Sequence, residues 1–130
     1  MRARSAFTLI ELVVVIIIIA ILAAVAVPKF INRADEAREA ATLQSLSTLR
    51  SAIELFNADT GSYPTTGSIT TDLAAYLKGP FPPVTIGGTS VATVTASASD
   101  PVVVEGSTGG WVYNPTTGDI RINLASHINQ

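Results

Sequence analysis

Residues 7–27 read FTLIELVVVIIIIAILAAVAV, and this stretch decides how the rest of the chain can fold. A helix over these residues would be about 31 Å long, which matches the roughly 30 Å hydrocarbon core of a bilayer. One ionisable side chain, that of Glu11, interrupts the run. A carboxylate within a membrane-length segment is costly. The sequence therefore predicts a membrane-spanning helix in which Glu11 has a specific role.

Two basic residues, Arg2 and Arg4, precede the apolar run. By the positive-inside rule they keep the N-terminus in the cytoplasm, so the chain after the span is exported. No later segment is long and apolar enough to span again. We expect a single-pass protein of the inner (cytoplasmic) membrane with its C-terminal part outside the cytoplasm.

Composition limits the chemistry of the chain. Its 130 residues suggest one small domain plus an appendage. There is no cysteine, which excludes disulfides and thiolate chemistry, and His127 is the only histidine. The net charge is −2, and no basic block beyond Arg2 and Arg4 offers a surface for nucleic acid. These features disfavour metal-centred or triad catalysis and a nucleic-acid partner.

Three interpretations of the apolar segment compete. Ala24, Val25 and Ala26 satisfy the A-x-A pattern of a secretory signal peptide, but the run exceeds the usual 7–15 apolar residues and contains Glu11. A plain membrane anchor explains the length but not the acid. The third interpretation depends on the residues around Glu11.

The segment from Ser5 to Leu12 reads SAFTLIEL, with basic residues upstream and an aliphatic stretch downstream. It resembles the class III signal of type IV pilins and of the pseudopilins of type II secretion. The resemblance implies that a prepilin peptidase cuts between Ala6 and Phe7, that Phe7 is then N-methylated, and that the apolar helix is retained. Most members of that family carry Gly where this chain has Ala6.

Cleavage would create an α-amine on Phe7, which is largely protonated at neutral pH. Glu11 lies four residues later and can neutralise that cation when helices pack in apolar surroundings. The resemblance implies that the favoured partner is the amine of an adjacent subunit. Because a helix that is apolar on all sides can slide against its neighbours, one charge pair would fix one axial offset. Glu11 is thus predicted to set assembly register.

Helical spacing continues beyond Pro28, which we expect to kink the helix. Apolar residues recur at steps of mostly three and four from Ile31 to Phe56, which indicates an amphipathic half. We predict one long helix from Phe7 to about Asn57, ended by a turn at Gly61 with Pro64 beyond it.

Short elements follow the helix. A capped helical turn is predicted over 71–77, and a loop or irregular hairpin over 84–94. Strands 110–114 and 119–123 alternate around a Pro-Thr-Thr-Gly turn, and 101–105 is the expected neighbouring strand. The predicted fold is α+β: a long N-terminal helix, half transmembrane and half amphipathic, packed against a small antiparallel β-sheet.

The resemblance extends loosely past the helix. The stretch Gly61-Ser62-Tyr63-Pro64 and the strand carrying Trp111 and Tyr113 are similar to features of pseudopilins related to the major subunit. The expected organisation is a leader peptide at 1–6, a transmembrane or filament-core helix at 7–28, its amphipathic half at 29–58, and a small globular part with a C-terminal β-hairpin at 59–130.

Other candidate sites are weak. Asp100, Glu105 and Asp119 are the calcium candidates, since calcium prefers oxygen ligands and some pseudopilins bind it in a C-terminal loop. No dense acidic loop is present, so solvated charges are the preferred interpretation and no cofactor is expected. Trp111 and Tyr113 are predicted to lie in the core, and His127 is predicted to be exposed.

The sequence thus predicts a structural protein without enzymatic activity: a subunit of a helical filament, a type II secretion pseudopilus in preference to a type IV pilus. The expected partners are copies of itself or other pilins, prepilin peptidase, an inner-membrane assembly platform with its ATPase, and membrane lipid before assembly. After assembly the filament would be periplasmic or extracellular. Two alternatives stay open, a membrane-tethered binding module that does not polymerise and a secreted domain released by an ordinary signal peptide.

Overall fold

The N-terminal half of the chain is one continuous helix. The computed structural model describes residues 7–106 and 109–130, and its helix α1 runs from Leu9 to Thr60. Pro28 lies inside α1. A proline there removes one i→i−4 hydrogen bond, but helical structure continues on both sides of it. The prediction of one long helix is confirmed, and it begins and ends within three residues of the predicted bounds.

The end of α1 follows from its sequence. Gly61 has a positive φ of 77°, and its amide donates to the carbonyl of Asn57 at 2.8 Å. Glycine adopts this left-handed conformation without the steric penalty of a Cβ atom, which is why helices often terminate there. Pro64 follows and turns the chain back.

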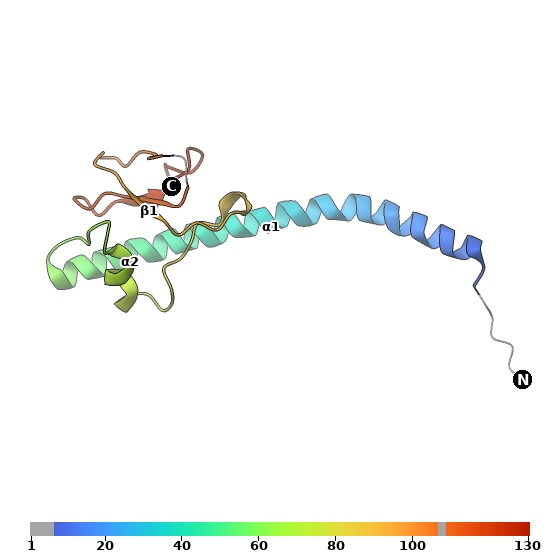
Figure 1. Ribbon diagram of the computed structural model, residues 1–130, viewed down its shortest axis with the longest axis horizontal. Coiled ribbons are helices and arrows are strands. Elements are labelled where there is room, and N and C mark those ends of the chain that lie inside the picture. Colours follow the sequence, from blue (N-terminus) through green and yellow to red (C-terminus); the bar gives the residue numbers. More distant parts are fainter. Residues whose placement is uncertain (1–6, 107–108) are drawn as a thin grey trace, which may run out of the picture. The chain divides into compact units, whose positions relative to one another are not determined.

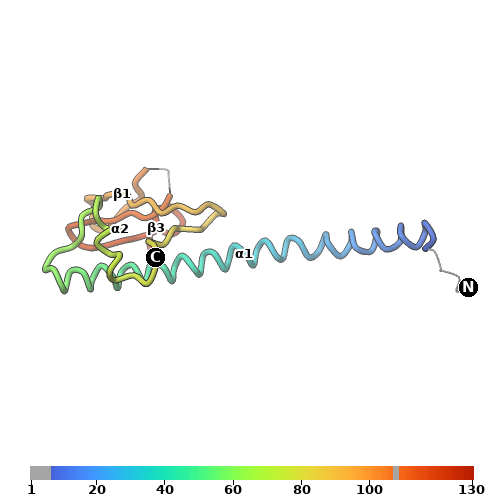
Figure 2. Tube along the Cα trace, turned by 60° about the horizontal axis from the view of Figure 1, so that its bottom comes forward, coloured from blue at the N-terminus to red at the C-terminus, as the bar shows by residue number. Residues whose placement is uncertain are grey.

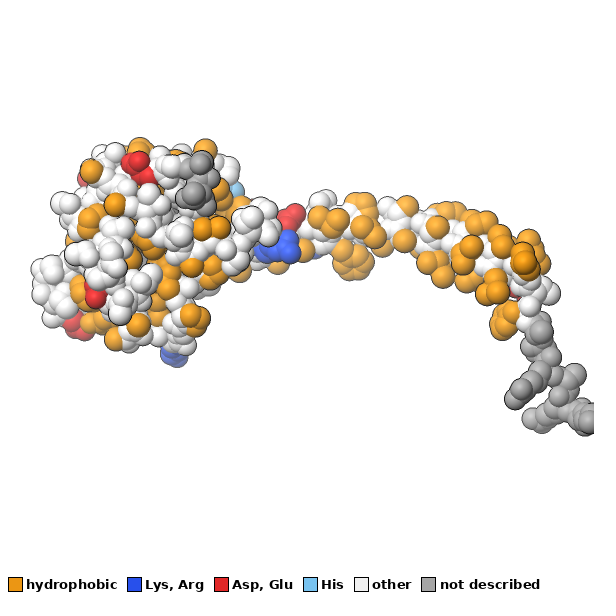
Figure 3. Space-filling view, in the orientation of Figure 1, with side chains coloured by type: hydrophobic (Ala, Val, Ile, Leu, Met, Phe, Trp, Pro, Cys, Tyr) orange, Lys and Arg blue, Asp and Glu red, His pale blue; other side chains and the backbone are white. Residues whose placement is uncertain are grey.

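The chain divides into two units, Met1–Glu36 and Ala37–Gln130. In the first unit every described residue except Val13 and Ala26 is exposed, so α1 makes no core there. Figure 3 shows that hydrophobic side chains cover most of the visible face of this helical stretch.

The second unit has a core built on one side of the C-terminal half of α1. Leu46, Leu49 and Ile53 are spaced by three and four residues and are fully or almost fully buried. They pack with α2 (Ile69–Asp72), the 3₁₀ helix η1 (Leu73–Ala75), and the strands described below. Figures 1 and 2 both place these elements alongside that half of α1. The remaining core residues are Ala52, Ile69, Leu73, Val84, Trp111, Tyr113, Ile120 and Ile122.

The sheet has three strands in the order β1 (Val94–Ala96), β2 (Trp111–Tyr113) and β3 (Ile120–Ile122). Strands β2 and β3 pair antiparallel, with Trp111 opposite Ile122 and Tyr113 opposite Ile120, as the hairpin pattern predicts. Strand β1 pairs parallel to β2. The α+β class is confirmed, but the sheet is mixed rather than antiparallel.

The predicted strand at 101–105 is wrong, and at the end of this segment the side chain of Asn123 binds the backbone groups of Glu105 that a neighbouring strand would bind. The amide of Glu105 donates to Asn123 Oδ1 at 2.9 Å, and Asn123 Nδ2 donates to the Glu105 carbonyl at 2.7 Å. Residues 101–105 have no strand structure, and β1 occupies the free edge of β2 instead. An asparagine side chain can substitute for a strand partner in this way because it carries both a donor and an acceptor.

Two further local predictions have different outcomes. Val84 and Val91 form an antiparallel bridge around the 3₁₀ helix η2 (Ile86–Gly88), so the irregular hairpin over 84–94 is confirmed. The turn predicted over 71–77 belongs to α2 and η1, which begin at Ile69 and have no side-chain cap. The Ser68 hydroxyl donates to the carboxylate of Asp72 instead of accepting from helix amides.

Candidate assembly surface on the N-terminal helix

The apolar residues of α1 from Leu9 to Ile31 form an exposed surface of a size that is rare on monomeric soluble proteins. Large apolar residues on all sides of the helix are roughly half exposed or more, among them Ile10, Ile16, Ile21 and Val27. Contiguous apolar surface of this extent marks an interface with lipid or with another protein. Within the described residues, α1 is the one helix long and apolar enough to cross a membrane.

Thr8 and Glu11 form a capping box at the start of α1. The amide and hydroxyl of Thr8 both donate to Glu11 Oε2, at 2.8 and 2.7 Å, and the amide of Glu11 donates to Thr8 Oγ1 at 3.3 Å. Such reciprocal bonding satisfies amides that have no partner within the helix. It also places the carboxylate near the positive end of the helix dipole, which favours a negative charge.

One of the two carboxylate oxygens of Glu11 accepts no hydrogen bond from the described residues. Both bonds from Thr8 end on Oε2, and Oε1 accepts no hydrogen bond from the residues that the structure describes. A carboxylate oxygen in this state can accept from a cationic group without giving up the cap.

Phe7 lies on the same side of the helix as Glu11. Phe7 as a whole residue is 83% exposed, and together with Ile10, Glu11, Val14 and Val15 it lines a hollow of about 380 Å³. The hollow is apolar apart from the carboxylate. Ala6, the other residue of the predicted cleavage site, lies outside the described residues, as do Arg2 and Arg4.

Thr8 is the functional residue that the sequence reasoning missed. The signal was present, because a Ser or Thr followed three residues later by Glu before an apolar run is the pattern of a capping box. The prediction considered Glu11 as a partner for the Phe7 amine, within the chain or in a neighbouring subunit, and did not consider Thr8. The structure shows that its first partner is Thr8.

The calcium candidates have separate local partners. Asp119 forms an ion pair with Arg121 at 2.9 Å, and the carboxylate of Glu105 accepts from Ser97 Oγ at 3.1 Å. Asp100 is exposed. Within residues 7–106 and 109–130, no three His, Asp or Glu side chains are grouped so that they could hold a metal ion.

Trp111 and Tyr113, the two aromatic residues of β2, each donate a hydrogen bond to a different loop. Trp111 Nε1 donates to the Pro82 carbonyl at 2.8 Å, and the Tyr113 hydroxyl donates to the Pro64 carbonyl at 3.0 Å. Both side chains are fully buried, which confirms the prediction that they belong to the core. Burial raises the pKa of the Tyr113 hydroxyl well above its ordinary value, and the charges of Tyr63, Asp72 and Glu54 add to that shift.

His127 is not freely exposed as predicted. Its side chain is 14% exposed, and Nε2 lies 3.1 Å from the carboxylate of Glu39 on α1. The residue helps to hold the C-terminal segment against the helix, together with Arg121, which donates to the Ile128 carbonyl. A polar sequence around His127 gave no signal for this, because the contact joins positions 88 residues apart.

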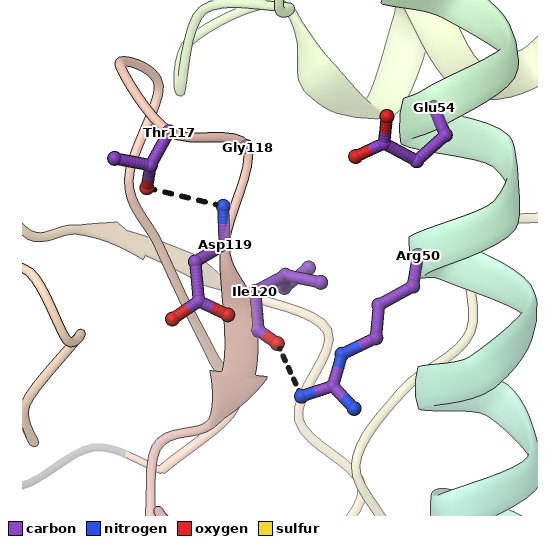
Figure 4. Close-up of a pocket in the computed structure, with 6 residues that line it drawn as sticks. All are labelled: Arg50, Glu54, Thr117, Gly118, Asp119 and Ile120. Atoms are coloured by element: carbon purple, nitrogen blue, oxygen red, sulfur yellow. Dashed lines mark hydrogen bonds between the residues drawn. The ribbon is translucent and has the colours of Figure 1, made fainter.

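The globular unit has a shallow polar hollow of about 280 Å³ between α1 and the β2–β3 turn, and Figure 4 shows the residues that line it. Arg50 reaches from α1 and donates to the Ile120 carbonyl at 3.2 Å, while the amide of Asp119 donates to Thr117 Oγ1 at 3.4 Å. Arg50 thereby fastens the hairpin to the helix. These bonds make the hollow part of the packing between the two elements.

The match of this chain to a known protein family covers its N-terminal segment. Residues 1–27 match the family model for the prokaryotic N-terminal methylation motif. The chain carries the signature of type IV pilins and pseudopilins. The pilin-type motif spans the capping box, Glu11 and nearly the whole apolar run, and it indicates a structural rather than enzymatic protein. No curated protein and no solved structure matches the chain.

Proposed function

We propose that this pilin-type chain is the structural subunit of a helical filament, cut by prepilin peptidase between Ala6 and Phe7 and methylated on the new amine of Phe7. One observation carries the proposal: residues 1–27 match a methylation motif, and the largely exposed apolar stretch of α1 within that motif holds one acid, Glu11, a single turn from the cleavage position. The helix needs a covering surface, and copies of the same helix provide one.

Glu11 gives that packing its register. In a bundle of apolar helices the ammonium group of one subunit's Phe7 must be neutralised, because an unpaired charge in such surroundings is strongly destabilising. The free oxygen Oε1 of Glu11 can accept that group while Oε2 keeps its bonds to Thr8. Since each helix carries one such acid, one axial offset between neighbours is selected.

Before assembly the same helix would lie in the inner membrane as a single span, with its N-terminus in the cytoplasm and residues after it on the outer side. Extraction would need an assembly platform and an ATPase contributed by other chains. The exposed apolar surface of α1 supports this stage, because lipid covers it as well as another helix does.

Within the pilin-type proteins we favour a type II secretion pseudopilus over a type IV pilus. The support is the Gly61-Ser62-Tyr63-Pro64 stretch, in which the Pro64 carbonyl anchors Tyr113, and the absence of cysteine from the chain. The motif at residues 1–27 is shared by both systems.

The test compares two substitutions of Glu11 in cells that contain the assembly machinery. Glu11→Leu removes both the charge and the cap, whereas Glu11→Gln removes the charge but keeps an oxygen that can accept from Thr8. We expect membrane insertion and cleavage in both variants and a sharp loss of filaments in both. Normal filaments from Glu11→Leu would overturn the register role. Normal filaments from Glu11→Gln alone would assign that role to the cap rather than the charge.

A further inference from the structure

One face of α1 changes from apolar to basic near the end of the apolar run. The residues on this face follow one another at helical steps and line a groove of about 460 Å³. They are Leu22, Val25, Ala26, Lys29, Phe30 and Arg33. The first three are aliphatic, and the two cations lie one turn apart at the other end.

Lys29 and Arg33 differ in whether they form an ion pair within the chain. Lys29 forms no ion pair with any of the described residues. Arg33 Nη1 donates to Glu36 Oε2 at 3.0 Å, but both side chains are largely exposed, at 82% and 65%. A guanidinium group has five N–H donors, so Arg33 can bind a second anionic group beside Glu36. Lys29 and Arg33 also share an adjoining hollow with Asn32 and Glu36.

The position of this face along the helix places it at a membrane surface. Twenty helical steps separate Leu9 from Lys29, or about 30 Å, which is the thickness of the hydrocarbon core. With the N-terminus in the cytoplasm, Lys29 and Arg33 reach the headgroups of the outer leaflet. Phe30 is 74% exposed at the same level, where aromatic side chains are favoured.

We propose that this face binds an anionic phospholipid of the outer leaflet, an inference that rests on the membrane stage of the proposed function. The phosphodiester lies between Lys29 and Arg33, and an acyl chain lies along Leu22, Val25 and Ala26. Charge complementarity supports this occupant, because an anionic headgroup neutralises Lys29 without disturbing an existing ion pair.

A second copy of the chain fits this face less well. The acids of α1 nearest this face already have partners: Glu36 pairs with Arg33, Glu39 lies 3.1 Å from His127 Nε2, and Asp35 also has an interaction within the chain. A neighbouring helix would therefore offer Lys29 one of these carboxylates only by breaking a pair. A lipid brings its own negative charge, so the contacts of Glu36 with Arg33 and of Glu39 with His127 stay intact. The lipid leaves this face when the subunit is extracted from the membrane.

The experiment uses the full chain in nanodiscs of equal parts phosphatidylglycerol and phosphatidylcholine, followed by native mass spectrometry of the released protein. The readout is the ratio of retained anionic to zwitterionic lipid. We expect phosphatidylglycerol to be enriched, and Lys29→Gln or Arg33→Gln to lower the enrichment by about fivefold each, the effect of one cation at a membrane surface. Lys78→Gln is the matched control, since it removes one charge from an exposed position outside this face and leaves the enrichment unchanged.

Other outcomes would overturn the proposal. Equal retention of the two lipids, or enrichment that survives both substitutions, means that the face does not select a headgroup. Loss of enrichment on adding inorganic phosphate means that the face binds a free anion. Enrichment found only in discs with two copies assigns the face to a subunit interface. A chain that fails to enter phosphatidylcholine nanodiscs contradicts the membrane stage itself, whereas insertion without enrichment contradicts only the lipid site.

Discussion

Thr8 and Glu11 hydrogen-bond each other in both directions, with the Thr8 amide and hydroxyl donating to Glu11 Oε2 at 2.8 and 2.7 Å and the Glu11 amide donating to Thr8 Oγ1 at 3.3 Å. The acid that interrupts the apolar run therefore has a partner in its own chain before any assembly. This lowers the cost of carrying a carboxylate at the edge of a membrane span. It also holds one carboxylate oxygen in a fixed place for a second partner.

Thr8→Val should loosen the first turn of α1, because valine keeps the shape of threonine but has no hydroxyl. Loss of an N-cap side chain destabilises a helix start by about 1 kcal/mol, which corresponds to about fivefold faster exchange of the Glu11 amide. Hydrogen exchange of the whole chain in detergent micelles measures this. Thr8→Ser retains the hydroxyl and should exchange at the original rate. Equal rates in the Val and Ser variants would show that the capping box contributes nothing.

Tyr113→Phe should lower the free energy of unfolding of the globular unit. The substitution leaves the Pro64 carbonyl without the hydrogen bond that the Tyr113 hydroxyl now donates at 3.0 Å, a loss of about 1–2 kcal/mol. Fluorescence of Trp111, the single tryptophan, reports unfolding of this unit during a urea titration. An unchanged midpoint would mean that water replaces the lost donor.

The same tyrosine predicts how stability depends on alkaline pH. Burial raises the pKa of Tyr113 in the folded chain, whereas the unfolded chain ionises near pH 10. Above that pH the unfolded state binds fewer protons than the folded state, so stability falls as pH rises. Tyr76 contributes in the same direction, because its hydrogen bond to Asp59 raises its pKa. Urea midpoints measured at neutral pH and above pH 10 should therefore fall less in Tyr113→Phe, and an equally steep fall would contradict the assignment.

Gly118→Ala and Gly87→Ala form a matched pair that separates backbone strain from packing. Both glycines have φ near 75°, so each substitution carries the penalty of a left-handed residue, about 1–2 kcal/mol. A Cβ at Gly87 meets open space, but one at Gly118 collides with the ring of Tyr63. We expect Gly118→Ala to lose a further 1–3 kcal/mol or so from overpacking. Near-UV circular dichroism during thermal unfolding measures the difference, and equal melting temperatures would show that the Tyr63 ring moves aside freely.

Much of this fold could be predicted because its signals are local. The long helix, its end at Gly61 and the β2–β3 hairpin each follow from periodicity and turn residues within a short window. The parallel pairing of β1 with β2 could not be predicted, since it joins Val94 to Trp111 across a long loop and leaves no local signal in the sequence. The contact between His127 and Glu39 was missed because it, too, joins residues far apart in the sequence, at a separation of 88 positions.

The candidate site shows the same division between local and distant signals. Glu11 was found because an acid in an apolar run is conspicuous. Thr8 was missed although its spacing to Glu11 is a known local pattern. The groove ending at Lys29 and Arg33 was not identified from the sequence, although the predicted long helix already places these two cations one turn apart on one face; its lining residues come from the structure.

The measurement that tests the central claim most directly is the mass and sequence of the N-terminal peptide of the mature protein, purified from cells that contain prepilin peptidase. A filament subunit processed as proposed begins at Phe7 and carries one methyl group on its amine. A chain that begins at Met1 would indicate a tethered protein that is never processed for assembly, and one that begins at Val27 would indicate an ordinary secreted domain. Either of these results would contradict the proposed function, because the amine that pairs with Glu11 would not exist.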